Sequence, residues 1–325
     1  MHKRIKKDRN LIKFLQGNVF DKVKELEDNS IDCVVTSPPY WGLRDYGVSG
    51  QLGLEPTYQE HIKNIVELFK AIKPKLKDTA TVWLNYGDSY ASTVNGTKVK
   101  DIKKDEFTPT YRDKPISTIQ GSLKAKDLVM IPNRIAIALQ DDGWWIRSEI
   151  IWHKPNPMPE SVRDRPTSAH EKIWLITKNK KYYYDADAIK EPSITKNKPT
   201  KNLIQIKGAD TPNIKKGGIR LTEKGTSPHF PAPNFLKNKR NVWTITSKPC
   251  KESHFATFPK DLIEPCIKAG CPENGTVLDP FGGSGTTGIV AVENNRKAIL
   301  IELNKEYIDI AKKRISQELG LFNTL

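Results

Sequence analysis

The sequence predicts an α/β fold built on a doubly wound, mostly parallel sheet, and three observations support this prediction. Along the 325 residues, apolar stretches of strand length alternate with stretches of helical period. Residues 276–278, 279–285 and 286–293 are typical of a strand, a glycine-rich turn and the start of a helix. Residues 31–35 form another apolar run, and the consecutive prolines that follow it cannot continue a strand or a helix.

The remaining elements follow from apolar spacing. A short helix is expected over residues 20–26, before the strand at 31–35. Residues 61–76 repeat apolar side chains every three or four positions, which is the period of a helix, and residues 80–85 form the next strand of a β-α-β unit. Further elements are expected at residues 130–140 (helix), 144–152 (strand), 171–177 (strand), 260–269 (helix) and 298–301 (strand).

The glycine loop, as we name residues 279–285, is the first candidate for a functional site. A strand that runs through such a turn into a helix brings backbone N–H groups close to a ligand. The spacing Gly283-x-Gly285-x-x-Gly288 is that of a dinucleotide-binding fingerprint, and Glu302 follows about 20 residues later, where a carboxylate can bind ribose hydroxyls. The turn alone leaves three cofactors open: a nicotinamide dinucleotide, a nucleoside triphosphate or S-adenosylmethionine.

Composition narrows the choice of partner. The formal net charge is +15, and so basic a surface favours a polyanion, with nucleic acid as the leading candidate. A membrane-binding protein is the rival, but no apolar run approaches the ~18 residues of a spanning helix. The basic residues at 2–7 have no apolar segment behind them, as a signal peptide would. We therefore expect a soluble, cytoplasmic protein without a membrane partner.

The four cysteines are too scattered for a disulfide framework in a chain of this length, and reduced thiols are expected. They lie at Cys33, Cys250, Cys266 and Cys271. No paired Cys-x-x-Cys motif occurs, so we expect no bound metal.

The proline loop, as we name Ser37, Pro38, Pro39 and Tyr40, is the second candidate. Its prolines stiffen the backbone so that carbonyl oxygens and the Ser37 hydroxyl point to one spot, while Tyr40 offers a flat face for stacking. Such a site suits a planar base held by its exocyclic amine. Hydrogen-bond acceptors on the amine protons draw the nitrogen towards tetrahedral geometry and free its lone pair for attack on a methyl group.

Together, these motifs resemble those of the DNA amino-methyltransferases of the beta group, which use S-adenosylmethionine to methylate N4 of cytosine or N6 of adenine. The order matches this group: the proline loop first, a recognition region in the middle and the glycine loop last. Residues 83–90 and 254–259 extend the resemblance over most of the chain. It implies a permuted, Rossmann-like methyltransferase domain with three parts: a catalytic half at 11–178 that includes a basic loop at 92–126, a basic target-recognition insert at 179–251, and a cofactor-binding half at 252–325.

The resemblance also implies which residues form the site. Those assigned to S-adenosylmethionine are Asp279, Phe281, Gly283, Ser284, Thr286, Glu302, Phe255, Ala256, Thr257, Phe258 and Asn18. Glu302 is expected on the ribose hydroxyls. Asn18 stands where the family usually has the Asp of a Gly-Asp pair that meets the adenine, and its amide can donate or accept. Those assigned to catalysis are Ser37, Pro38, Pro39, Tyr40 and Asp88.

The first residue of the proline loop bears on the target base. Ser at this position usually accompanies methylation of cytosine N4, so Ser37 favours cytosine, and adenine N6 is the alternative. A hydroxyl accepts less strongly than a carboxylate, so a nearby acid would help, and Asp88 is the candidate; its other interpretation is a turn or helix-capping Asp. The base must be flipped out of the duplex, and we expect Tyr40, helped by Trp41, to stack on it.

Double-stranded DNA is therefore the expected partner, in a restriction-modification system or a mobile element. The basic stretches at 92–126 and 179–251 are interpreted either as solvated loops or as arms that contact phosphates. A homodimer and a cognate restriction endonuclease on another chain both stay open on this sequence.

Four rival functions explain less of the sequence. A P-loop NTPase would need a Lys that the glycine loop lacks. A nicotinamide-dependent oxidoreductase leaves the proline loop unexplained, and a non-enzymatic DNA-binding protein explains the charge alone. Methylation of cytosine C5 uses a Pro-Cys nucleophile, but Cys266 lies among apolar residues of a predicted helix, as a small buried side chain would.

Overall fold

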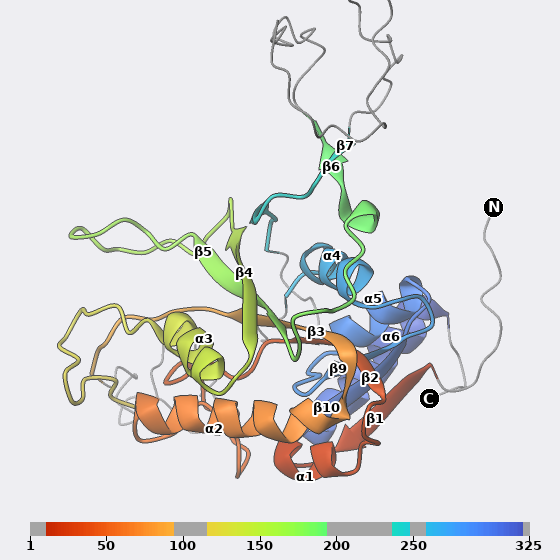
Figure 1. Ribbon diagram of the computed structural model, residues 1–325. Helices are drawn as coiled ribbons and strands as arrows, with labels where there is room; N and C mark the ends of the chain where they lie inside the picture. The colour runs from red at the N-terminus through yellow and green to blue at the C-terminus, as the bar shows by residue number, and fades with distance from the viewer. Residues whose placement is uncertain (1–10, 94–115, 194–235, 248–257, 321–325) are drawn as a thin grey trace, which may run out of the picture. The chain divides into compact units, whose positions relative to one another are not determined.

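One eight-stranded sheet organises most of the chain, in the order β1-β10-β9-β2-β3-β5-β4-β8 (Figure 1). The computed structural model describes residues 11–93, 116–193, 236–247 and 258–320. The strands of this sheet are β1 (Ile12–Gln16), β2 (Ile31–Thr36), β3 (Leu76–Tyr86), β4 (Trp145–His153), β5 (His170–Thr177), β8 (Val242–Thr244), β9 (Thr276–Asp279) and β10 (Lys297–Glu302).

The sheet is mostly parallel, as predicted. The pairs β1·β10, β10·β9, β9·β2, β2·β3 and β4·β8 are parallel, and only β5 runs against both of its neighbours, β3 and β4. Parallel neighbours need a crossover connection, and a helix supplies it between β2 and β3 and between β9 and β10. β4 and β5 need none, because antiparallel strands can be joined by a loop.

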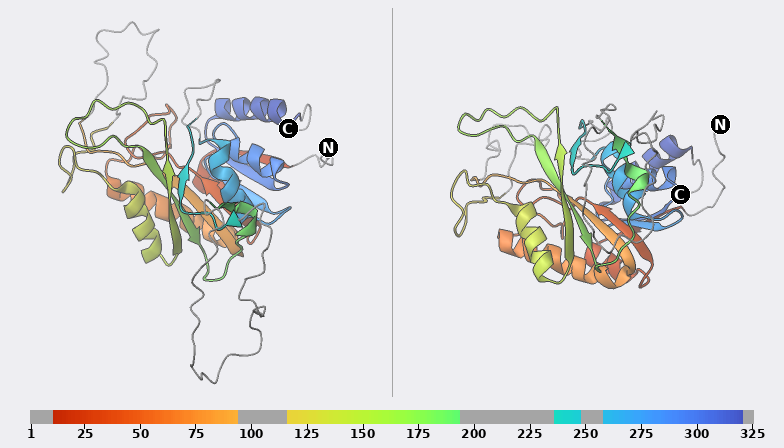
Figure 2. Two further views of the ribbon diagram at one scale, coloured as in Figure 1. Left: turned by 90° about the horizontal axis from the view of Figure 1, so that it is seen from above. Right: turned by 45° about the horizontal axis from the view of Figure 1, so that its top comes forward.

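Two layers of helices cover the two faces of the sheet (Figures 1 and 2). One layer holds α1, α2 and α3, and the other holds α4, α5 and α6. Each helix buries the apolar side of its sequence period, as α2 does with Ile65, Phe69 and Ile72. The helices are α1 (Val19–Lys24), α2 (Tyr58–Ile72), α3 (Ile131–Asp141), α4 (Lys260–Gly270), α5 (Thr286–Glu293) and α6 (Lys305–Leu319).

All helices and strands expected from the sequence are present, with ends that shift by a few residues. The largest shifts are at the end of α2, which stops at Ile72 where 61–76 was predicted, and at the start of β3, which begins at Leu76 where 80–85 was predicted. Pro74 lies in a 3-10 turn, Lys73–Lys75, and Leu76 already begins β3. A proline tolerates the first turn of a helix but not its interior, which explains why the helix cannot run on.

The sequence analysis did not predict β1, β8, α6 or the two short strands at residues 191–192 and 236–237. β1 is five residues long and fully buries only Ile12, and α6 buries only three of its residues, Ile308, Ala311 and Ile315. Such weak periodicity falls below what spacing can detect.

The point where the sheet reverses its order lies between β9 and β2. From β9 the chain continues outward to β10, and from β2 it continues outward to β3 on the other side. Ligands of open α/β sheets bind beyond the carboxyl ends of the strands at such a point. The glycine loop follows β9 and the proline loop follows β2, so the two candidate motifs meet there although they lie at opposite ends of the sequence.

The chain divides into two compact units, residues 1–188 with 240–325, and residues 189–239. The second unit contains a two-stranded antiparallel sheet of β6 (Glu191–Pro192) and β7 (Leu236–Lys237). The predicted insert, 179–251, is wider than this unit: residues 179–188 and 240–247 belong with the first unit, where β8 joins the main sheet. Among the described residues, no helix combines the length and apolarity that crossing a bilayer requires.

Candidate active site

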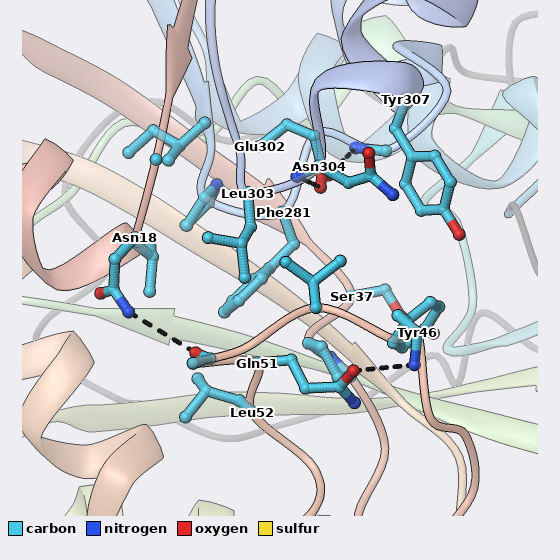
Figure 3. A pocket seen from close by; sticks show the side chains of 18 of the residues that line it. Asn18, Ser37, Tyr46, Gln51, Leu52, Phe281, Glu302, Leu303, Asn304 and Tyr307 are labelled. Atoms are coloured by element: carbon cyan, nitrogen blue, oxygen red, sulfur yellow. Dashed lines mark hydrogen bonds between the residues drawn. The ribbon is translucent and has the colours of Figure 1, made fainter.

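A cavity opens beyond the carboxyl ends of the central strands, where the two loops meet. Figure 3 shows Glu302 and Asn304 on one side of it and Gln51 and Leu52 on the other. The lining comes from four segments, each after a parallel strand: residues 17–19 after β1, residues between 37 and 52 after β2, residues 280–284 after β9, and residues 301–307 at the end of β10 and beyond.

The glycine loop can turn at the edge of this cavity because glycine stands at its tightest positions. Gly285 has a φ of +78° and precedes the first residue of α5. A Cβ on Gly282 would lie 2.9 Å from the Cβ of Leu300, so a side chain there would push the loop off β10. The loop residues that line the cavity are Pro280, Phe281, Gly283 and Ser284.

Asp279 lies beneath the loop and is not part of the cavity lining. Its carboxylate accepts hydrogen bonds from Thr36 Oγ1 at 2.8 Å, from Phe281 N at 3.1 Å and from Thr287 Oγ1 at 2.6 Å. Burial raises the pKa of Asp279 to about 6. The carboxylate thus holds β2, the glycine loop and α5 together, and a direct contact of Asp279 with the cofactor stays a prediction.

Glu302, the last residue of β10, does line the cavity. Its Oε2 accepts a hydrogen bond from Gly283 N at 2.9 Å, and its Oε1 accepts one from Asn304 N at 2.9 Å. Burial raises the pKa of its carboxyl. Each carboxylate oxygen can accept a second hydrogen bond, so the fixed carboxylate suits a pair of neighbouring hydroxyl groups.

Ser284 and Thr286 are joined by one guanidinium. Nη1 of Arg314, on α6, donates to Ser284 Oγ at 3.0 Å and to Thr286 Oγ1 at 2.8 Å. Ser284 lines the cavity, whereas Thr286 is buried behind it in the first turn of α5. Arg314 was not predicted, because α6 carries no motif that would single it out. It also pairs with Glu318, at 2.7 Å from its Nε.

Asn18 caps α1 and faces the cavity. Its Oδ1 accepts from Phe20 N at 2.9 Å, and its Nδ2 lies 3.5 Å from the carbonyl oxygen of Gly50, as Figure 3 shows. The rest of the predicted cofactor contacts fall elsewhere: Phe255, Ala256 and Thr257 lie outside the described residues, and Phe258 precedes α4, half-buried.

The proline loop places Ser37 in the cavity lining and Tyr40 behind it. Ser37 Oγ donates to Tyr40 Oη at 3.3 Å, and Tyr40 Oη donates to Glu171 Oε2 at 2.8 Å. One face of the Tyr40 ring stacks on Tyr86, with 4.5 Å between ring centroids. Burial and the charge of Glu171 raise the pKa of the Tyr40 hydroxyl well above its usual range. Tyr40 is therefore neutral, with one ring face already covered.

Asp88 has the helix-capping role that was its alternative interpretation. Its Oδ1 accepts from Ile131 N, the first residue of α3, at 3.2 Å, and from Ser89 N at 2.9 Å. The acid that reaches the proline loop is instead Glu171, on β5. Sequence reasoning missed it because β5 reads as an ordinary strand, and only its antiparallel pairing with β3 brings Glu171 next to the loop.

Trp41 does not serve as a stacking partner, contrary to expectation. It is 1% exposed, and its Nε1 donates to the carbonyl oxygen of Glu55 at 2.9 Å. Its backbone N donates to Tyr86 Oη at 2.8 Å, and Tyr86 in turn contacts His61 Nε2 at 2.7 Å. Trp41 is thus part of the support beneath the proline loop.

Cys266 is a buried side chain of α4, as the sequence predicted, and burial also shields Cys33 and Cys271. Cys250 lies outside the described residues. The buried Cys266 thiol donates to the carbonyl oxygen of Leu262 in its own helix, and Cys33 and Cys271 are buried as well, so the described cysteines offer no exposed nucleophile for C5 methylation.

Comparison with known proteins agrees with this geometry. Residues 31–313 match the family N6_N4_Mtase, described as DNA methylase. The chain is 45% identical to the type II methyltransferase M.SmaI of Serratia marcescens over 303 residues, which cover 93% of this chain and 90% of that protein. It is 41% identical to the type II methyltransferase M.Cfr9I of Citrobacter freundii, over 93% of this chain and 87% of that protein.

Solved structures share the fold. The PvuII DNA methyltransferase, named as cytosine-N4-specific, superposes with a TM-score of 0.60 at 18% identity, over 96% of this chain and 92% of that one. TTHA0409 of Thermus thermophilus, a putative DNA modification methylase solved with S-adenosylmethionine, gives 0.58 at 20% identity, over 96% of both chains.

These matches span nearly the whole chain and include both loops. They confirm the predicted fold, the predicted class of enzyme and S-adenosylmethionine as its methyl donor. The chain belongs to the N6_N4_Mtase family of DNA methylases, enzymes that methylate exocyclic amines of DNA bases.

Proposed function

We propose that this methyltransferase modifies N4 of cytosine, in a base flipped out of double-stranded DNA. The observation that carries the proposal is the position of Ser37: it is the first residue of the proline loop, and it lines the cavity beside the glycine loop. The name of the PvuII enzyme, cytosine-N4-specific, supports the same choice. Methylation of adenine N6 is the alternative, because both bases present an exocyclic amine of similar chemistry.

The proposed chemistry uses acceptors on the amine. S-adenosylmethionine supplies an electrophilic methyl group on its sulfonium when it is bound. Ser37 Oγ accepts a hydrogen bond from the amine, which increases the electron density on the nitrogen. The stiff backbone of Pro38 and Pro39 keeps that acceptor in line with the cavity, so that much of the rate comes from orientation.

We further propose roles for the residues around the cofactor. Glu302 binds the ribose hydroxyls, since its carboxylate is fixed by Gly283 and Asn304 and keeps acceptor capacity. Phe281, Gly283 and Ser284 surround the methionine part, and Asn18 contacts the adenine. Asp279 and Thr286 shape the loop from behind.

The proposed biological setting is a cytoplasmic restriction-modification system with a cognate endonuclease on another chain. The support is that the relatives M.SmaI and M.Cfr9I are named type II methyltransferases. The basic segment 179–251 is proposed to find the target sequence, because Lys and Arg contacts to phosphate supply most of the non-specific affinity for DNA.

The test is to identify the methylated base. DNA from cells that express the protein is digested to nucleosides and analysed by mass spectrometry, and single-molecule sequencing of the same DNA reports the site. N4-methylcytosine is expected, and its level should fall when Ser37 is replaced by Ala. N6-methyladenine as the sole product would overturn the choice of base and leave the family assignment intact.

A further inference from the structure

The two hydroxyl groups of the proline loop are linked by hydrogen bonds to the carboxylate of Glu171, which is not part of any sequence motif. Ser37 Oγ, Tyr40 Oη and Glu171 Oε2 form a chain of hydrogen bonds of 3.3 and 2.8 Å. Ser37 donates to Tyr40. Tyr40 donates to Glu171, with Asn85 Oδ1 as a second acceptor at the longer distance of 3.3 Å, so each hydroxyl proton points away from the cavity. The lone pairs of Ser37 Oγ are then left to accept a hydrogen bond from a substrate amine.

The partners of Glu171 fix its orientation. Asn85 Nδ2 donates to the same Oε2 at 3.2 Å, and Lys154 Nζ forms an ion pair with Oε1. The side chain of Glu171 is 17% exposed. The carboxylate is thus held against Tyr40 on one side and can exchange a proton with water on the other.

We propose that Glu171 takes up, through Tyr40 and Ser37, the proton that the target amine loses when it is methylated. This inference rests on the proposed role of Ser37 as the acceptor for that amine. It holds for cytosine or adenine, because both amines carry the same excess proton after transfer. Glu171 touches none of the reacting atoms and acts through Tyr40, so it is a positioning residue.

Every proton and electron pair of the transfer has a destination. The nitrogen lone pair forms the new N–C bond as the S–C bond breaks, and that electron pair stays on sulfur, which becomes a neutral thioether. The nitrogen is left with a positive charge and an extra proton. That proton moves to Ser37 Oγ, the Ser37 proton moves to Tyr40 Oη, and the Tyr40 proton moves to Glu171. The resulting carboxylic acid then returns the proton to water.

Tyr40 suits a relay of this kind. Because burial and Glu171 raise the pKa of its hydroxyl, Tyr40 does not lose its proton unless it receives another. The transfer is therefore concerted and leaves no tyrosinate behind. Proton transfer by positioned groups typically contributes about 100-fold or more to a rate.

The test compares Glu171→Gln, Glu171→Asp and Tyr40→Phe with the wild-type protein in single turnover. Glu171→Gln and Tyr40→Phe are each expected to slow methyl transfer about 100-fold, and the double variant should be no slower than the slower single variant. Glu171→Asp keeps a carboxylate and should recover part of the loss. The matched control is Glu149→Gln, which removes a carboxylate of the neighbouring strand β4 that pairs with Lys172; wild-type rates are expected.

Three further measurements separate the relay from a structural role. The wild type should show a solvent deuterium isotope effect with a curved proton inventory, since several protons move together, and Glu171→Gln should lose that curvature. Affinity for S-adenosylmethionine by calorimetry, and base flipping reported by 2-aminopurine fluorescence with S-adenosylhomocysteine bound, should be unchanged in Glu171→Gln. A wild-type rate in Glu171→Gln, or equal losses of flipping and rate, would overturn the relay.

Different results would contradict the proposed role of Ser37 and the proposed relay. Full activity of Ser37→Ala would remove Ser37 as the acceptor, whatever Glu171 does. An inactive Ser37→Ala beside a fully active Glu171→Gln would keep the acceptor and exclude the relay.

Discussion

Thr36, at the end of β2, donates a hydrogen bond of 2.8 Å to Asp279, at the end of β9, across 243 positions of the sequence. The bond joins the strand that leads into the proline loop to the strand that leads into the glycine loop. The proline loop and the glycine loop come from opposite ends of the sequence, so their relative position depends on such lateral contacts between neighbouring strands. A buried carboxylate with three donors makes this contact stiff.

The buried Asp279 predicts how stability depends on pH. Its pKa is about 6 in the folded protein against an ordinary value of 3.8, so the folded state binds the proton more tightly than the unfolded state. The free energy of unfolding should therefore fall as pH rises from about 4 to 7, by up to about 3 kcal/mol from this group. Asp279→Asn has no proton to lose, so its free energy of unfolding should not fall in this way. In urea unfolding, its stability relative to the wild type should therefore rise from about pH 4 to pH 7. Asp309→Asn, an exposed carboxylate of α6, is the control; parallel profiles for wild type and Asp279→Asn would refute the assignment.

Glu302 predicts a pH dependence of cofactor binding. The carboxylate binds hydroxyl groups best when ionised, and burial raises its pKa. Affinity for S-adenosylmethionine should therefore weaken as pH falls below neutrality, and Glu302→Gln should bind about 10-fold more weakly at neutral pH, a loss of about 1.4 kcal/mol. Isothermal calorimetry measures both effects. Glu306→Gln changes an exposed acid in the first turn of α6 and should bind S-adenosylmethionine with the wild-type affinity. An equal loss of affinity in that variant would mean that net negative charge, and not a contact of Glu302 with the cofactor, determines binding.

The sequence predicted the sheet and each of the two loops, because both depend on local signals. Apolar runs predicted β2 and β9, and the prolines and glycines that end them predicted the loops. The spacing of apolar residues cannot show which strands lie side by side in the sheet. Nothing local places β5 beside β3, so the carboxylate at the proline loop was sought at Asp88, just after β3, and not at Glu171 on β5.

Ser37 and Asp88 predict opposite kinds of defect. Ser37→Ala should slow methyl transfer in single turnover about 100-fold and leave stability nearly unchanged. Asp88→Ala removes the cap of α3 and should cost about 1 kcal/mol of stability in urea unfolding, while the folded protein stays active. Asp88→Asn keeps a capping side chain and should resemble the wild type in both respects. An inactive but stable Asp88→Asn would restore the catalytic role that the sequence suggested.

The close packing around Gly87 predicts that one added methyl group, in Gly87→Ala, displaces the proline loop. A Cβ at Gly87 would lie 2.7 Å from Cε2 of Tyr40 and 3.3 Å from Cγ of Glu171. Tyr40 already stacks on Tyr86, so its ring must tilt and its bond to Glu171 must lengthen. We expect Gly87→Ala to slow methyl transfer about 100-fold, since a displacement near 1 Å can cost that much. The affinity for S-adenosylmethionine, measured by calorimetry, should be unchanged, because neither Tyr40 nor Glu171 lines the cofactor cavity.

Gly270→Ala is the contrasting variant, because the same added methyl group meets the core. Its Cβ would lie 2.3 Å from Thr81 Oγ1 and from Trp83 Nε1, where the end of α4 packs on β3. Overpacking of this kind typically costs about 1–3 kcal/mol, so urea unfolding should shift while the folded fraction transfers methyl groups at the wild-type rate. If Gly87→Ala instead lost stability and kept its rate, the contact of Gly87 with Tyr40 would be structural only, and the hydrogen-bond chain to Glu171 would not limit the reaction.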